Sequence, residues 1–183
     1  LLQIWEDDWN KNKNIILQSI SQRIHLLKLK KLNNTDEFDS NIFVLSSEFV
    51  ETFVNKNSLN NFISASFYLG LKDNNDNVVS VMRFNIKSIV LNIIQYVSLC
   101  QNNVINSFIH YVKDKYIFDY ISVFLDNAIN DSYLYESYGF ELSNIFSPEC
   151  KYIVNSERKD LGNDLTNKLK IWDAGKSEYI LKI

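Results

Sequence analysis

The chain has 183 residues, 46% hydrophobic and 14% aromatic, so it can bury a core and is not a disordered tail. Its 19 basic and 22 acidic residues give a net charge of -3, which argues against a surface built for non-specific binding of nucleic acid. The most apolar run, Ile86–Cys100, contains Lys87, Asn92 and Gln95, so it is not a membrane span.

The first segment predicts a short strand followed by a helix. Leu1–Trp5 is an apolar run, and the acidic cluster Glu6–Asp8 after it suits a helix N-terminus. The helix carries an apolar stripe at mostly four-residue spacing, formed by Trp9, Ile16, Ile20, Ile24 and Leu27. We expect residues 1–32 to be a unit of their own, separated by the polar linker Asn33–Ser40 from a second domain at 41–183.

One basic cluster stands out in the chain, and it consists of Arg23, Lys28, Lys30 and Lys31. Cations at this position suit a solvated helix end, where they complement the helix dipole. Alternatively, the same four side chains contact the phosphates of double-stranded DNA. The second interpretation makes them the candidate DNA-binding residues.

From Asn41 onward the pattern is that of a mixed α/β sheet. Strands are expected at Ile42–Leu45, Phe62–Leu71, Val78–Phe84, Ile89–Cys100, Tyr120–Leu125, Phe140–Phe146, Lys151–Val154 and Glu178–Ile183, with a hairpin turn at Asp73–Asn77. Helices are expected after Ser46 or Ser47, at Val104–Tyr116, between Asp131 or Ser132 and Gly139, and at Ser156–Lys168. A hairpin followed by strand, helix, strand, helix and strand predicts one parallel crossover.

The stretch Leu134–Phe140 joins a short helix to a strand through Gly139, where a left-handed residue is needed. Its pattern, L-Y-x-x-x-G-F, resembles the one that closes the sheet of acetyltransferases of the GNAT superfamily. The resemblance implies a GNAT-like mixed sheet flanked by helices. It also implies an N-acetyltransferase that uses acetyl-CoA, with Tyr135 in the place of a general acid. A tyrosine on a short helix also fits the edge of a core.

The same family binds the diphosphate of acetyl-CoA at a glycine-rich turn before a helix. The corresponding turn here, Gln101–Ser107, has no glycine, and we expect the bulky Val104 and Ile105 to obstruct the backbone. The isolated His25 and His110 are not expected to be catalytic.

An ordered set of segments resembles the C-terminal half of phage homing-endonuclease-like proteins, in which a GNAT-like domain follows a Vsr-like PD-(D/E)XK nuclease core. The segments are Leu2–Trp9, Asn57–Ser66, Tyr68–Leu71, Val79–Phe84, Leu134–Phe140 and Ile171–Gly175. The resemblance implies that residues 1–32 are the final strand and helix of such a core. Magnesium is then expected only with an upstream core, because Glu6–Asp8 are adjacent and cannot converge on one ion. Ser58 replaces the family's histidine, and Asp39–Phe43 lacks its positive charge.

The sequence therefore predicts an accessory, DNA-associated module with no catalytic residue, cofactor or metal site of its own. The alternatives are a degenerate GNAT-like domain that contacts another phage protein, and an acetyl-CoA-dependent N-acetyltransferase. The phage interpretation places the chain in the host-cell cytoplasm or in the virion. Cys100 and Cys150 fit no metal spacing and are expected to be reduced core thiols.

Overall fold

The computed structural model describes the chain at residue 4 and over residues 6–32, 42–58, 62–99, 104–127, 132–154, 157–159 and 170–183. Of the strand expected at Leu1–Trp5, only Ile4 is described, and it belongs to no strand. The linker Asn33–Ser40 lies outside the described residues, and the division of the chain after residue 32 stays a prediction.

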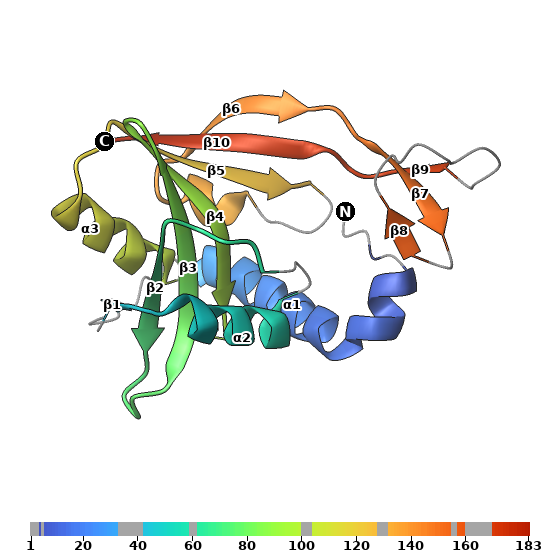
Figure 1. The fold of residues 1–183 in the computed structure, drawn as a ribbon, viewed down its shortest axis with the longest axis horizontal. Coiled ribbons are helices and arrows are strands. Elements are labelled where there is room, and N and C mark those ends of the chain that lie inside the picture. The colour runs from blue at the N-terminus through green and yellow to red at the C-terminus, as the bar shows by residue number, and fades with distance from the viewer. Residues whose placement is uncertain are drawn as a thin grey trace.

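Seven strands form one mixed sheet in the order β1-β2-β3-β4-β5-β10-β6 (Figure 1). Their bounds are β1 Ile42–Val44, β2 Phe67–Lys72, β3 Val78–Lys87, β4 Val90–Ser98, β5 Tyr120–Asp126, β6 Glu141–Phe146 and β10 Lys176–Lys182. Within this sheet β4 and β5 are parallel, and the other neighbouring pairs are antiparallel. The mixed α/β sheet and its parallel crossover are confirmed.

A second, three-stranded antiparallel sheet has the order β8-β7-β9, with β7 at Cys150–Val154, β8 at Glu157–Lys159 and β9 at Lys170–Trp172. The helix expected at Ser156–Lys168 is therefore wrong where it is described, because β8 pairs with β7 instead. Pairing with a neighbouring strand has overridden the local helical preference. The half-buried Cys150 belongs to this small sheet as a free thiol and not to the core, while Cys100 lies outside the described residues.

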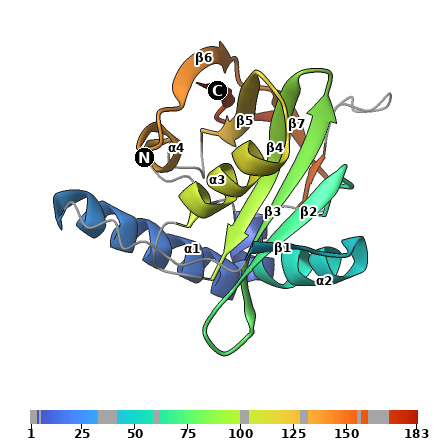
Figure 2. The same cartoon turned by 90° about the vertical axis from the view of Figure 1, so that its left-hand side faces the viewer.

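Four helices accompany the sheet: α1 Glu6–Leu32, α2 Ser47–Asn57, α3 Ile105–Lys115 and α4 Tyr133–Glu136. The Ser46 hydroxyl caps α2 by accepting a hydrogen bond from the backbone N–H of Phe49 at 3.3 Å. Figure 2 shows α2 and α3 on opposite sides of strands β2, β3 and β4. The sheet therefore has two covered faces, which we name the α2 face and the α3 face.

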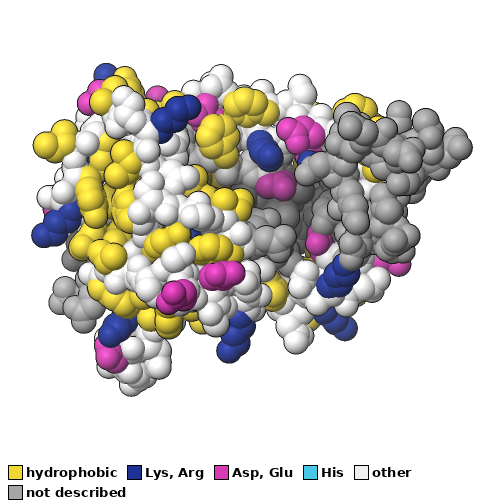
Figure 3. Space-filling model, in the orientation of Figure 1, with side chains coloured by type: hydrophobic (Ala, Val, Ile, Leu, Met, Phe, Trp, Pro, Cys, Tyr) yellow, Lys and Arg dark blue, Asp and Glu magenta, His cyan; other side chains and the backbone are white. Residues whose placement is uncertain are grey.

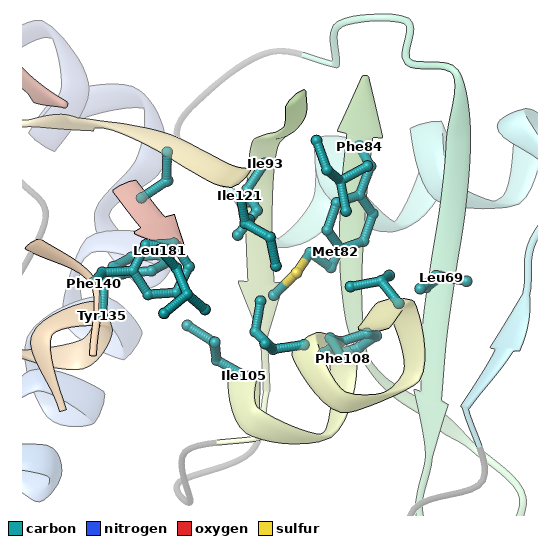
Figure 4. Close-up of a cluster of buried hydrophobic side chains, with 14 of the residues drawn as sticks. Leu69, Met82, Phe84, Ile93, Ile105, Phe108, Ile121, Tyr135, Phe140 and Leu181 are labelled. Carbon is teal, nitrogen blue, oxygen red and sulfur yellow. The ribbon is translucent and has the colours of Figure 1, made fainter. Parts of the chain in front are cut away.

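The α3 face carries the larger core, drawn in Figure 4. Strands β2 to β5 and β10 meet α3 and α4 there, and the fully buried members include Leu69, Met82, Phe84, Leu91, Ile105, Phe108 and Ile121. The α2 face carries a smaller cluster of Val50, Phe53, Val54, Tyr68, Val81 and Val97. Side chains alternate between the two faces along each strand, as the pleat of a sheet requires.

Helix α1 confirms the predicted helix but not its buried stripe. Ile16 is only 3% exposed, whereas Trp9 is 37% and Ile24 50% exposed. The backbone leaves the helical conformation at Asn12, with φ -129° and ψ 26°. This kink changes the direction of the helix between Trp9 and Ile16, so the two side chains no longer share one face. None of the helices within the described residues is long and apolar enough to cross a membrane.

Candidate functional site

Strands β4 and β5 separate toward their carboxyl ends. Their parallel pairing covers four residues, from Val90 opposite Tyr120 to Ile93 opposite Val123, although both strands continue beyond this point. Figure 1 shows the two strands diverging. The register between β3 and β4 shifts at the same place, which makes Ile94 an extra residue in β4. A bulge bends and twists its strand, and this accounts for the divergence.

A group of phenols lies on the α3 face beside the diverging part of β4. Tyr96 of β4 packs edge-on against Phe108, with ring centroids 6.3 Å apart. Tyr135 of α4 is only 6% exposed, and its ring meets Phe140 edge-on at 5.5 Å. The electrostatic influence of Tyr96 reaches both Tyr135 and Tyr138. The chain therefore brings tyrosines from β4 and from the α4 region to one place.

Burial makes these phenols weaker acids than an exposed tyrosine. It raises the pKa of Tyr135 far above the ordinary 10.0, and Tyr96 adds to the effect. Burial also raises the pKa of Tyr138, to about 12, helped by Tyr96 and Tyr133 and opposed by a hydrogen bond from the Asn106 backbone N–H. At neutral pH both side chains can therefore donate a hydrogen bond to a developing anion.

Gly139 explains how the chain presents Tyr135. Its φ is +85°, and its N–H donates to Glu136 O at 3.0 Å, while the N–H of Phe140 donates to Tyr135 O at 3.3 Å. These two bonds form the Schellman motif that ends a helix, and the Tyr135–Phe140 ring contact is the apolar contact that accompanies it. The predicted role of Gly139 is confirmed.

The N-terminus of α3 differs from expectation. Val104 and Ile105 are 1% and 0% exposed and belong to the core, so their side chains do not obstruct the outer side of the backbone. The apolar pattern of an amphipathic helix has turned both of them inward. The backbone N–H of Asn106 in the first turn instead donates a hydrogen bond to the Tyr138 hydroxyl. The turn at residues 100–103 lies outside the described part of the chain.

The candidate DNA-binding residues Arg23, Lys28, Lys30 and Lys31 all fall in the second half of α1, and their side chains lie outside the described part of the structure. Figure 3 shows the Lys and Arg side chains of one face dispersed, with no continuous basic surface in that view. No group of His, Cys, Asp or Glu within the described residues could hold a metal ion. His110 is exposed on α3. DNA binding stays a prediction.

Sequence reasoning pointed to Tyr135 but missed Tyr96 and Tyr138. Tyr96 lies between Gln95 and Val97 in a largely apolar strand, where an aromatic residue is ordinarily part of the core. Its place beside the divergence depends on the bulge at Ile94, and no local pattern predicts a bulge there. Tyr138 was placed inside the helix-to-strand pattern, but its contact with Asn106 joins two elements that are distant in sequence.

No family model and no curated protein sequence matches the chain. Several solved structures are similar to the chain in fold. The ribosomal-protein-S18-alanine N-acetyltransferase from Escherichia coli is similar with a TM-score of 0.55 and 10% identity, over 79% of this chain and 94% of that one. The Bacillus subtilis acetyltransferase in complex with CoA has a TM-score of 0.52 and 13% identity, over 79% of this chain and 99% of that one.

The spermidine/spermine N-acetyltransferase from Vibrio cholerae has a TM-score of 0.54 and 10% identity, over 78% of this chain and 92% of that one. Identities this low show similarity of fold alone. The resemblance to phage homing-endonuclease-like proteins gains no support from these structures and stays a hypothesis. The expected fold is confirmed: over most of its length, this chain has the mixed, helix-flanked sheet of the GNAT-like acetyltransferases.

Proposed function

We propose that the chain is an N-acetyltransferase that uses acetyl-coenzyme A. The observation that carries the proposal is the divergence of β4 from β5 beside the buried phenol of Tyr135. Acetyltransferases of the same fold, one of them solved with CoA, support it.

The residues where β4 and β5 diverge suit a ligand such as acetyl-CoA, which is a thioester carried on a chain that contains amide groups. The pairing of β4 with β5 ends at Ile93, and an extended chain with amide groups can lie along the edge of a strand. The apolar and aromatic side chains of the α3 face adjoin this edge. At the diphosphate end, the Asn106 N–H already has the Tyr138 hydroxyl as its acceptor. A bound diphosphate would therefore have to replace the Tyr138 hydroxyl as the acceptor of this N–H.

When bound, acetyl-CoA supplies an activated acetyl group, and the protein orients it and stabilises the charge that develops as an amine attacks. Tyr135 is the residue placed for this task. Its pKa is raised by burial, whereas an ordinary thiol has a pKa of about 8.5. The phenol is therefore a weaker acid than the departing thiol. We infer that Tyr135 donates a hydrogen bond to the leaving sulfur and does not give up its proton completely.

The test is acetyl transfer to a panel of amines by the full chain, with direct titration of acetyl-CoA by calorimetry. Tyr135→Phe is expected to lower kcat about 100-fold with little change in cofactor affinity, as loss of one donor to a developing charge does. The matched control is Tyr120→Phe, which sits where β4 and β5 are still paired. Absence of both binding and transfer for the unaltered chain would end the proposal.

Duplex DNA is the partner in a second candidate function, the DNA-associated module. The observation in its favour is that Arg23, Lys28, Lys30 and Lys31 all fall within one stretch of nine residues in α1. Fluorescence anisotropy of labelled duplex DNA is expected to give a log–log salt slope of roughly -2 to -4, which flattens when the three lysines become alanine. No binding at low salt would reject this candidate and leave contact with another protein as the alternative.

A further inference from the structure

The α2 face contains a buried positive charge. Arg83 lies in the middle of β3 and is 1% exposed, so it is among the largest fully buried side chains. Nη1 of its guanidinium donates to the carbonyl oxygen of Ile63, and Nη2 donates to Oε1 of Gln95. The Phe62 ring lies 5.0 Å from the guanidinium carbon. Each of these partners is electrically neutral.

No carboxylate within the described residues pairs with this charge. The ion pairs of Lys72 with Asp76 and of Lys151 with Glu149 do not involve Arg83. The Nε atom of Arg83 is buried and has no hydrogen-bond partner at all. Burial lowers the pKa of Arg83, and the nearby Tyr68 opposes this effect. A guanidinium nevertheless stays charged, so the fold holds an uncompensated cation and an orphaned donor.

A purely structural role explains this arrangement poorly. Buried arginines are ordinarily satisfied by a carboxylate that accepts two parallel hydrogen bonds. Tyr68 is the nearest group that could carry negative charge, but its hydroxyl already accepts hydrogen bonds from Ser47 Oγ at 3.2 Å and from the Ala65 N–H at 3.0 Å. An apolar side chain in the centre of β3 would fill the position without desolvating a charge.

We propose that Arg83, held in position by Gln95, binds the carboxylate of a small ligand on the α2 face. A carboxylate carries one negative charge and so balances one guanidinium. It can also accept from Nε, which is the donor left unpaired. A phosphate dianion would bring a second charge, and the contacts of Arg83 include no other cation.

The loop Phe62–Ser66 covers Arg83 and would have to move aside to admit such a ligand. The carbonyl of Ile63 contacts Arg83, yet the side chain of the same residue is 60% exposed. Ile63, together with the Phe62 ring, therefore lies over the guanidinium. The loop is held to the sheet by polar contacts, such as Ser66 N–H to Asn85 Oδ1 at 2.7 Å, and by the packing of Phe62 and Ala65 against the apolar cluster of the α2 face. Polar contacts of this kind exchange with water at small net cost.

The anchor also lies next to the proposed reaction site. Gln95 is on β4 beyond Ile93, where β5 no longer pairs. A ligand held at Arg83 and Gln95 would therefore border the diverging strands from the α2 face, while Tyr135 approaches from the α3 face. On the basis of the proposed function, the acceptor is then an amine that also carries a carboxylate.

The first experiment measures binding without acetyl-CoA. The full chain is titrated with β-alanine and with β-alaninamide, which differ at the carboxylate, and the thermal midpoint is followed. We expect β-alanine to raise the midpoint and the amide to leave it unchanged. Arg83→Met should abolish the response, and Arg83→Lys should weaken affinity roughly tenfold, because lysine lacks the fork of donors. Lys72→Met, at an exposed ion pair on β2, is the control and should keep the full response.

Equal shifts with the acid and the amide, no shift with either at millimolar concentration, or a full response in Arg83→Met would overturn the inference. If Arg83→Met does not fold by circular dichroism, Gln95→Met provides the same test and should weaken β-alanine binding. Transfer assays then separate the two proposals. Binding of β-alanine without acetyl transfer to any amine rejects the enzyme but keeps the anion site. Equal transfer to acid and amide keeps the enzyme and rejects the site.

Discussion

The two faces of the sheet solve the problem of burial in opposite ways. On the α3 face, aliphatic and aromatic side chains from five strands and two helices fill the core, and its polar atoms are phenols. On the α2 face, a small apolar cluster that includes Tyr68 lies beside a guanidinium hydrogen-bonded to an amide, and the Tyr68 hydroxyl makes its own hydrogen bond to Ser47. The first arrangement maximises hydrophobic burial, and the second retains a charge that burial disfavours. The two faces therefore differ in how they accommodate polar groups.

The two faces also shift the pKa values of their tyrosines in opposite directions. Burial raises the pKa values of Tyr135 and Tyr138 on the α3 face. Burial alone would raise the pKa of Tyr68 too. Hydrogen bonds from Ser47, Ala65 and Ser64 outweigh it, with the charge of Arg83 adding to them, and the pKa is lowered. The same side chain therefore reports a dry environment on one face and a polar one on the other.

Truncation of the α3 core should give the largest effect. Phe108 is fully buried, and Phe108→Ala is expected to reduce the free energy of unfolding by about 3–5 kcal/mol. Val54→Ala on the α2 face removes two carbon atoms and should cost roughly 2 kcal/mol. Urea denaturation measures both. Equal losses would show that the two clusters contribute equally and would break the comparison.

Alkaline pH is expected to change the stability contributed by the tyrosines of the two faces in opposite directions. Tyr138 titrates near 10.0 when unfolded and at about 12 when folded, so the unfolded state loses its proton first. Stability contributed by this phenol is complete below about pH 10 and falls as pH rises toward 12. Because Tyr138 is only half-buried, the slope should stay below the roughly 1.4 kcal/mol per pH unit of one fully shifted proton.

Substitutions identify the groups responsible for the alkaline loss. Tyr135→Phe should flatten the decline in the denaturation midpoint. Tyr68 has a lowered pKa and adds stability above its unfolded value, so Tyr68→Phe should make the decline steeper. A decline that is identical in both variants would contradict the opposed environments.

Arg83→Met tests the cost of the buried charge. The substitution loses the hydrogen bonds to Ile63 and Gln95 but also removes a desolvated cation. These effects offset one another, and we expect the free energy of unfolding to stay within about 1 kcal/mol of the unaltered chain. A loss as large as that of Phe108→Ala would instead show that the α2 face depends on Arg83 for its stability.

A similarly small effect is expected at Tyr138, which follows α4 and contacts the first turn of α3. Tyr138→Phe removes the acceptor of the Asn106 N–H and should cost about 1 kcal/mol of stability. The freed N–H should then strengthen the binding of CoA, measured by calorimetry, while the affinity for pantetheine, which lacks the diphosphate, stays the same. Stronger binding of pantetheine would show that Tyr138 acts elsewhere in the site.

Much of the fold follows from local chemistry. Gly139 predicted a left-handed helix end, and Asp73–Asn77 predicted a hairpin turn that the structure confirms. The Asp73 carboxylate accepts hydrogen bonds from the N–H groups of Asn75 and Asn77, both at 2.9 Å. In these cases neighbours in sequence supply all the partners. The order of strands and helices then limited the topology to a parallel crossover.

Predictions from the sequence failed where contacts between residues distant in the chain determine the structure. Phe62–Leu71 alternates like a strand, yet only Phe67–Lys72 is β2, because Phe62 stacks on Tyr68 at 6.1 Å and the segment covers Arg83. In the sequence, Arg83 is a single charged residue within a largely apolar strand. Its partners Ile63 and Gln95 are 20 and 12 residues away. A charge within an apolar run of a central strand was the available signal, and sequence alone could not name its partners.

The position of β10 sets an order for folding during synthesis. Strand β6 is made before β10, yet β10 is its partner in the sheet and also separates it from β5. A nascent chain that has released Glu141–Phe146 must therefore hold this strand unpaired until Lys176–Lys182 emerges. Leu142 and Ile145 of β6 are 50% and 71% exposed even in the finished fold. The interval before β10 arrives is thus when the chain is most open to aggregation and to capture by chaperones.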